Sequence, residues 1–162
     1  MSTLSLPSVV VIGAGTMGHG IAQVAAVAGH AVTLVDASPA ALERAVAKVG
    51  QSLDKLVEKG KLGAEAAAGA RARLGVAAGV EDAVAGAGIV VEAIPENLEW
   101  KKALFARVDA AAPSGALLGT NTSSLSIGAI AAAVRDPSRV IGLHFFNPVS
   151  YTHLTLPTIY SV

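Results

Sequence analysis

Residues 9–36 read VVVIGAGTMGHGIAQVAAVAGHAVTLVD, and this stretch decides the fold class. It opens with Val9–Ile12, four apolar residues without polar alternation, which is typical of a parallel strand buried on both faces. A glycine-rich segment follows and opens an apolar helix that we expect to reach about Gly29. Residues 31–35 form a second β-branched run that ends at Asp36. A strand, a helix and a second strand in this order predict a parallel βαβ unit.

The same alternation continues to residue 143. Strands are expected at 89–91, 117–118 and 140–143, with a weaker one at 74–78, and helices at 98–112 and 126–134. Another helix should begin where Ser38 can act as the N-cap and Pro39 can take the first helical position. Its expected apolar face consists of Leu42, Val46, Val49, Leu53 and Leu56. Gly60–Gly69 is expected to be a helix–helix turn with an Ala-rich continuation. The pattern predicts a Rossmann-type, doubly wound α/β domain with a mostly parallel sheet and helices on both faces.

Composition limits the classes of function. The 162 residues include 12 Lys+Arg and 12 Asp+Glu, so the chain has no basic excess of the kind that nucleic-acid and membrane-surface binders show. Hydrophobic residues make up 52% of the chain, which argues against global disorder. The absence of cysteine excludes disulfides and thiolate metal sites, and we expect no metal. We identify no secretory signal and no apolar run long enough to span a bilayer, and we therefore expect a cytoplasmic protein.

A glycine fingerprint joins the first strand to its helix. The pattern GxGxxG is weak alone, but here it follows a buried strand and opens an apolar helix, as dinucleotide binding requires. The first glycine allows a tight turn, the second lets the backbone approach a pyrophosphate, and the third lets helix and strand pack closely. Backbone N–H groups at the helix start would then hold the phosphate charge. The residues of this loop are Gly13, Ala14, Gly15, Thr16, Met17 and Gly18.

Asp36 suggests which dinucleotide binds. It ends the second strand, where a carboxylate can hydrogen-bond the adenosine ribose. Ala37 and Ser38 follow it, and neither supplies the arginine that a 2′-phosphate would need, so NAD is favoured over NADP. The alternative is that Asp36 only caps the turn that follows.

Four stretches together resemble the 3-hydroxyacyl-CoA dehydrogenase family, which includes the bacterial 3-hydroxybutyryl-CoA dehydrogenases. These are residues 9–36, VVEAIPENLEWKKALF at 90–105, GTNTSSLSI at 119–127 and IGLHFFNPV at 141–149. LHFFNP and NTSSL at this spacing are far more specific than a glycine pattern. The resemblance implies that 1–149 form the NAD-binding domain of such an enzyme. It also implies the reaction, in which a 3-hydroxyacyl-CoA is oxidised by NAD to a 3-ketoacyl-CoA in fatty-acid or short-chain acyl-CoA metabolism, including β-oxidation.

The resemblance also implies site residues. The family's catalytic base falls on His144 and its substrate-positioning serine on Ser123. Its contacts to CoA fall on Ser52, Lys59 and Ser123. Its NAD contacts fall on the glycine loop and on Asp36, Glu96, Lys101, Ser123 and Asn147.

The chemistry of the residues supports the base independently. Neutral imidazole accepts a proton readily near pH 7, and His144 follows a predicted strand, where open α/β sheets place their ligands. The alternatives are that His144 packs beside two phenylalanines, that Ser123 caps the following helix, and that Lys59 is a solvated charge. His19 and His30 have no partner motif and are expected on a helix surface or in a turn.

Residues 150–162 depart from the family. There a glutamate that orients the imidazole stands twelve residues after the base, whereas this chain has Leu156. The resemblance implies that the helical C-terminal domain, through which the complete enzyme forms a homodimer, is absent. We interpret 150–162 as a non-native tail that resembles adapter read-through; an edge strand is the alternative. We therefore expect almost no turnover from this chain alone. The alternative functions are a non-catalytic NAD-binding module and a domain of a related β-hydroxyacid dehydrogenase.

Overall fold

The computed structural model describes residues 6–147, in which strands and helices alternate. The strands are β1 (Val9–Ile12), β2 (Val32–Val35), β3 (Leu74–Ala77), β4 (Ile89–Glu92), β5 (Leu117–Thr120) and β6 (Val140–Gly142). The helices are α1 (Thr16–Val27), α2 (Pro39–Glu58), α3 (Ala64–Ala72), α4 (Val80–Val84), α5 (Leu98–Ala111) and α6 (Ile127–Ala131), with a short 3₁₀ turn η1 (Pro137–Arg139) before β6.

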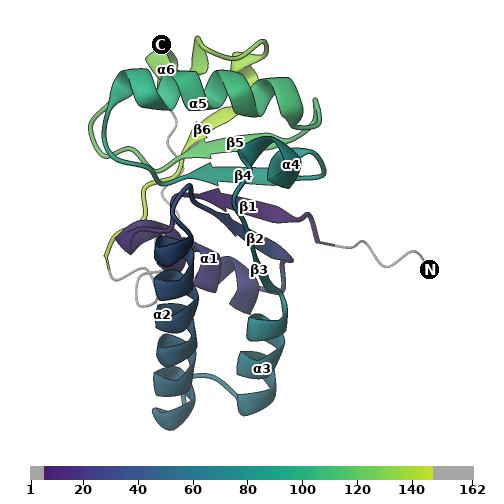
Figure 1. Cartoon of the computed structure of the whole chain (residues 1–162), viewed down its shortest axis with the longest axis vertical. Helices are drawn as coiled ribbons and strands as arrows, with labels where there is room; N and C mark the ends of the chain where they lie inside the picture. Colours follow the sequence, from purple (N-terminus) through teal and green to yellow (C-terminus); the bar gives the residue numbers. More distant parts are fainter. Residues whose placement is uncertain (1–5, 148–162) are drawn as a thin grey trace, which may run out of the picture.

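The six strands form one sheet in the order β3-β2-β1-β4-β5-β6, and every neighbouring pair is parallel (Figure 1). In the centre, Val11 lies opposite Leu34 on one side and Val91 on the other. This strand order is that of the Rossmann fold, so the predicted fold class is confirmed. The order reverses between β1 and β4, and ligands of such sheets bind at the carboxyl ends of the strands beside that point.

Alternate residues of β1 face two separate hydrophobic cores. Val9 and Val11 pack with apolar residues of α1, α2 and α3, whereas Val10 and Ile12 pack with those of α4, α5 and α6. Helices therefore cover both faces of the sheet, which explains why β1 at its centre consists only of apolar residues. No helix within residues 6–147 is long and apolar enough to cross a membrane.

Helix α2 begins as predicted and differs from the prediction on its apolar face. The Ser38 hydroxyl accepts a hydrogen bond from the Ala41 N–H at 3.3 Å, and Pro39 takes the first helical position. Leu53 is fully buried, but Val46 is 42% exposed. The expected face was wrong at this position because Val46 lies beside the edge strand β3, where it lines a hollow with Val76 and both side chains stay exposed.

The remaining differences lie in short segments. Helix α3 begins at Ala64, inside the stretch expected to be a turn, so the turn between α2 and α3 is shorter than predicted. Helix α6 covers only Ile127–Ala131 of the predicted 126–134, and α4 was not predicted. The weak strand at 74–78 is real and pairs with β2. The expected non-native tail at 150–162 lies outside the described residues.

Candidate functional site

The glycine loop, residues 13–18, follows the carboxyl end of β1, and at two of its glycines there is no room for a Cβ. Gly13 has a φ of +106°, and a Cβ there would lie 2.6 Å from the carbonyl oxygen of Ala93. A Cβ on Gly18 would lie 1.6 Å from the carbonyl oxygen of Gly13. By contrast, a Cβ on Gly15 would meet no atom within 4 Å. The loop therefore has no room for a side chain at Gly13, against the end of β4, or at Gly18, against its own backbone, and it is open at Gly15.

Helix α1 starts beside this open space. Its N-cap is Gly15, which provides no side-chain hydrogen bond, and its first turn contains no acidic residue. The positive end of the helix dipole is thus not neutralised by a side chain of that turn, which favours an anion there.

Asp36 ties the glycine loop to the end of β2. One carboxylate oxygen accepts the Ala14 N–H at 2.9 Å, and the other accepts the Ser38 N–H at 2.9 Å. The second bond is the turn cap that was expected as the alternative role of Asp36. Each carboxylate oxygen can accept more than one hydrogen bond, so these contacts hold the half-buried group in place and leave it able to accept a hydroxyl.

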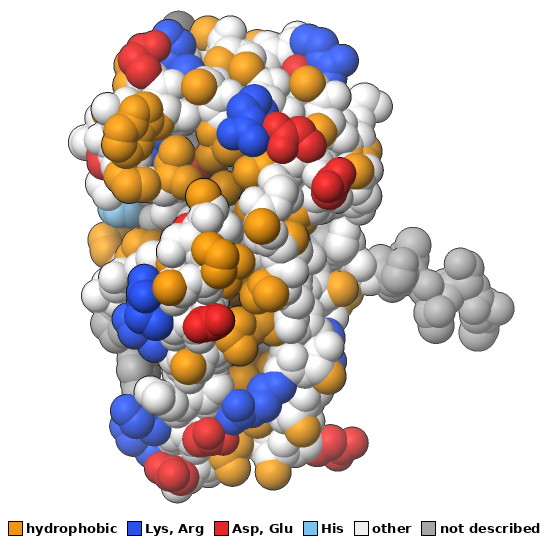
Figure 2. Space-filling model, in the orientation of Figure 1, with side chains coloured by type: hydrophobic (Ala, Val, Ile, Leu, Met, Phe, Trp, Pro, Cys, Tyr) orange, Lys and Arg blue, Asp and Glu red, His pale blue; other side chains and the backbone are white. Residues whose placement is uncertain are grey.

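A cavity of about 520 Å³ lies beside Asp36. Figure 2 shows that the face of the molecule bearing α2 and α5 is hollowed between them, with hydrophobic side chains around the hollow. The lining is apolar except for Asp36 and Arg107, and the half-exposed ring of Trp100 forms part of it. The lining residues come from the ends of β1, β2, β3 and β4, from the start of α4 and from one side of α5: Ile12, Gly13, Val35, Asp36, Ala37, Ala78, Val80, Ile94, Pro95, Trp100, Ala103, Leu104 and Arg107.

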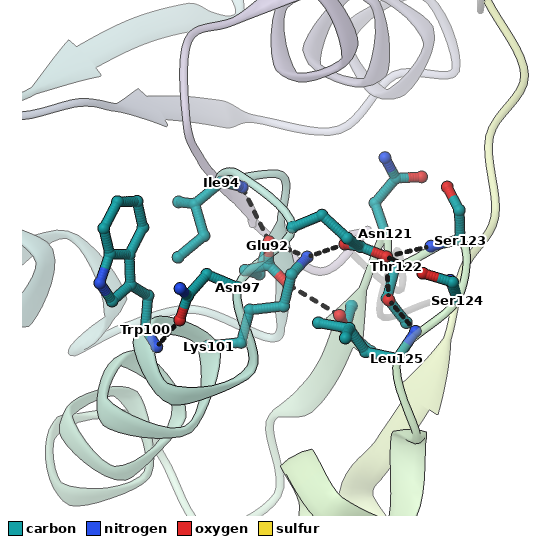
Figure 3. Close-up of polar contacts among 12 residues, drawn as sticks. Glu92, Ile94, Asn97, Trp100, Lys101, Asn121, Thr122, Ser123, Ser124 and Leu125 are labelled. Carbon is teal, nitrogen blue, oxygen red and sulfur yellow. Dashed lines mark hydrogen bonds and ion pairs between the residues drawn. The ribbon is translucent and has the colours of Figure 1, made fainter.

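A buried ion pair stands behind the loop that follows β4 (Figure 3). Lys101 of α5 has no exposed side-chain surface, and its Nζ donates to both carboxylate oxygens of Glu92, at 2.8 and 3.0 Å. The Thr120 hydroxyl and the Ile94 N–H also donate to Glu92, each at 2.7 Å. The Glu92 carboxylate therefore accepts four hydrogen bonds from three donor groups although it is almost completely buried.

Glu96 links this pair to the loop that carries Ser123. One carboxylate oxygen lies 3.1 Å from the Lys101 Nζ. The other accepts the Thr122 hydroxyl at 2.6 Å and the backbone N–H groups of Ser123 and Ser124, at 2.8 and 3.1 Å. A continuous chain of ion pairs and hydrogen bonds thus runs from the interior of the sheet to residues 121–124, the NTSS loop.

These donors stabilise the ionised form of Glu96. Burial alone would raise the pKa of its carboxyl, but the hydrogen bonds from Thr122, Ser123, Lys101 and Ser124 outweigh burial and lower the pKa to about 2. The group is therefore a carboxylate throughout the physiological pH range.

His144 and Asn147 lie beyond the carboxyl end of β6, and both are exposed. The His144 ring packs on Phe146 with 4.6 Å between ring centroids, so the packed arrangement considered from sequence is present without burying the imidazole. The neighbouring Phe145 N–H donates to the Asn121 side chain at 2.9 Å, which joins the segment of the histidine to the NTSS loop. Within residues 6–147 no acidic side chain pairs with His144.

The two residues expected to contact CoA lie apart from this group. Ser52 is half-buried within α2, and Lys59 caps the end of that helix. A helix of 20 residues is about 30 Å long, so Lys59 is about that far from Ser38 at the other end. The structure thus brings together the residues at the strand ends and leaves Lys59 at the C-terminal end of α2. Figure 1 shows this helix extending away from the strands.

Comparison with known proteins identifies the family. The family described as 3-hydroxyacyl-CoA dehydrogenase, NAD binding domain, matches residues 8–155. This chain belongs to that family. The predicted resemblance is confirmed, and so is NAD as the cofactor of the domain.

Individual relatives agree with this family and are longer than the chain. The chain is 50% identical to 3-hydroxyadipyl-CoA dehydrogenase of Escherichia coli over 90% of its own length and 30% of that protein. It is 42% identical to human mitochondrial hydroxyacyl-coenzyme A dehydrogenase over 87% of its length and 46% of the relative. The crystal structure of 3-hydroxybutyryl-CoA dehydrogenase from Escherichia coli superposes with a TM-score of 0.87 at 49% identity, covering 91% of this chain and 31% of that one. The chain therefore spans between 30% and 46% of the length of these relatives.

The geometry of this NAD-binding domain fits its cofactor in three ways. The space above Gly15 is free for a pyrophosphate, the start of α1 has no competing carboxylate, and a largely apolar cavity adjoins Asp36. The role of Glu92 was not predicted from the sequence, although this residue lies within the family-like segment 90–105. A glutamate in an otherwise apolar strand run was the available signal, because a buried carboxylate needs a buried partner.

Proposed function

We propose that this chain supplies the NAD-binding half of a dehydrogenase that oxidises a 3-hydroxyacyl-CoA to a 3-ketoacyl-CoA. The observation that carries the proposal is the contact chain from Glu96 through the NTSS loop to the segment of His144. It brings a cofactor-binding edge and a candidate base to the same end of the sheet.

Cofactor binding would be divided among three parts of the chain. The loop from Gly13 to Gly18 would take the pyrophosphate, and Asp36 with its cavity would take the adenosine. Toward the nicotinamide we propose contacts from Glu96, Ser123 and Asn147. Lys101 has no exposed surface, so we propose that it acts by fixing Glu96 in position.

In the chemical step the substrate would lose two hydrogens, one from C3 as a hydride and one from its hydroxyl as a proton. NAD supplies a hydride acceptor when it is bound. As the hydride leaves C3 of the substrate, His144 would accept the hydroxyl proton and Ser123 would hold the hydroxyl oxygen, so that the C–O bond becomes a carbonyl. Neutral imidazole is suited to this role near pH 7. Ser52, Lys59 and Ser123 would contact the CoA moiety.

Finer assignments follow the same proposal. We infer a cytoplasmic enzyme of fatty-acid or short-chain acyl-CoA metabolism, including β-oxidation, that assembles as a homodimer through a helical domain. A non-catalytic NAD-binding module is the second candidate. It is favoured by one observation, namely that no carboxylate within residues 6–147 pairs with the exposed His144.

Two measurements on the same samples test the proposal. Trp100, the only tryptophan, lines the cavity, so its fluorescence should change when NAD binds. NADH formation from 3-hydroxybutyryl-CoA is then followed at 340 nm with the parent chain, with the parent chain fused to the C-terminal domain of a relative, and with His144→Gln in that fusion. Equal NAD affinity, with turnover in the fusion that His144→Gln abolishes, supports the dehydrogenase. NAD binding without detectable turnover in the fusion favours the binding module, and no NAD binding contradicts both.

A further inference from the structure

The cavity beside Asp36 has an arginine on its other side. Arg107 of α5 lines it, and Glu81 of α4 pairs with that arginine. The Arg107 Nε donates to one carboxylate oxygen at 2.8 Å, and one terminal nitrogen donates to the other at 3.1 Å. Both oxygens of Glu81 are thus held by the planar fork of the guanidinium.

Charge in this cavity is sparse. Asp36 is the only acidic residue and Arg107 the only basic one among its lining residues, and the others are apolar or glycine. Asp36 is fixed by the N–H groups of Ala14 and Ser38, so it presents its negative charge from a constant position. A phosphate entering this cavity would therefore meet one fixed carboxylate and one arginine already paired with another carboxylate.

We propose that Glu81 is a coenzyme-selectivity residue: by holding and neutralising Arg107, it prevents that arginine from pairing with the 2′-phosphate of NADP. The proposal rests on the proposed function in one respect, that the adenosine binds in this cavity. Glu81 acts through Arg107 and is therefore a positioning residue. Asp36 repels the 2′-phosphate directly, and Glu81 removes the one cation of the cavity that could compensate for that repulsion.

The chemistry of the pair suits this role. The hydrogen bond from Arg107 lowers the pKa of the Glu81 carboxyl, and the same contact raises the pKa of the guanidinium, so both remain charged at neutral pH. The side chains are 56% and 51% exposed, so a ligand can reach the arginine if Glu81 releases it. A plain surface ion pair that only joins α4 to α5 is the competing explanation, and it predicts no effect on coenzyme choice.

The test is the ratio of the dissociation constants for NADP and NAD, measured by Trp100 fluorescence and calorimetry at low salt. We expect Glu81→Gln to tighten NADP binding about three- to tenfold, with NAD changed less than about twofold. The gain should shrink in about 1 M salt, where charges are screened within about 3 Å. Glu99→Gln removes the same charge from a pair with Lys102 that does not line the cavity, so it should leave the ratio unchanged.

The double variant Glu81→Gln/Arg107→Met separates the mechanism from a general field effect. If Arg107 takes the 2′-phosphate, the gain disappears in this variant. A gain that persists without Arg107, or an unchanged ratio in Glu81→Gln, would overturn the proposal while leaving NAD binding intact. A parent chain that does not bind NAD would overturn both this proposal and the proposed function.

Discussion

Replacing Lys101 by Met tests the buried network most directly. Methionine is similar in length to lysine but has no ammonium group. The change therefore leaves the Glu92 carboxylate, with 1% of its surface exposed, without its charged partner. Removing one member of a buried ion pair costs about 3–5 kcal/mol. For a domain of about 150 residues, 1 kcal/mol corresponds to about 2–4 °C in Tm, so we expect a loss of about 6–20 °C.

The assay is thermal and urea unfolding of four variants: Lys101→Met, Glu92→Gln, the double variant Glu92→Gln/Lys101→Met, and Lys102→Met. Lys102→Met is the surface control, because the neighbouring Lys102 pairs with Glu99 in solvent and should cost less than about 0.5 kcal/mol. Glu92→Gln/Lys101→Met removes both charges and should recover at least half of the loss, since no uncompensated charge remains. A loss below about 1 kcal/mol in Lys101→Met, or a double variant as unstable as the sum of the two single ones, would refute the reasoning.

Three further predictions use single sites. Gly18→Ala should destabilise the fold by about 1–3 kcal/mol or more, because its Cβ would lie 1.6 Å from the Gly13 carbonyl oxygen. Gly15→Ala, whose Cβ meets no atom within 4 Å, should leave Tm unchanged and weaken NAD binding in a fluorescence titration. The pKa of Glu96 is lowered to about 2, so the stability that its carboxylate contributes is complete above the ordinary pKa of 4.5 and is lost as the pH falls toward 2. The Tm of Glu96→Gln, measured against pH, should lack that decline on the acid side. Asp36→Ala should weaken NAD binding by about 1–3 kcal/mol, and a parent chain that binds NADP as tightly as NAD would count against this assignment.

Features that depend on neighbouring residues in the sequence were predictable. The apolar run Val9–Ile12, the glycines after it and the Ser38–Pro39 start each carry a local physical signal, and each occurs where expected. The contacts of Glu92 were not predictable in this way. Its partner Lys101 is on the next helix and Thr120 is on the next strand, so the cluster exists only once β4 and β5 are paired.

Two other differences also have physical causes. The exposure of Val46 depends on where the sheet ends, which the periodicity of α2 does not contain. Helix α4 has five residues, too few for a helical period to be recognised. The charge state of Glu96 likewise depends on the N–H groups of a distant loop, and its sequence neighbours do not indicate it.

The parallel pairing of β1 with β4 also affects how the domain folds. Val11 and Val91 are neighbours across this pair although the whole first half of the domain separates them in the chain. Pairings of this kind require closure of a long loop before any contact forms, which makes folding slow. The glycine loop leaves β1 at this seam, so the phosphate-binding site is assembled only when the two halves of the sheet have joined. A ligand bound there stabilises the joined state alone, by about 2.7 kcal/mol at a hundred times its Kd, and should therefore slow global unfolding more than local fraying at either edge.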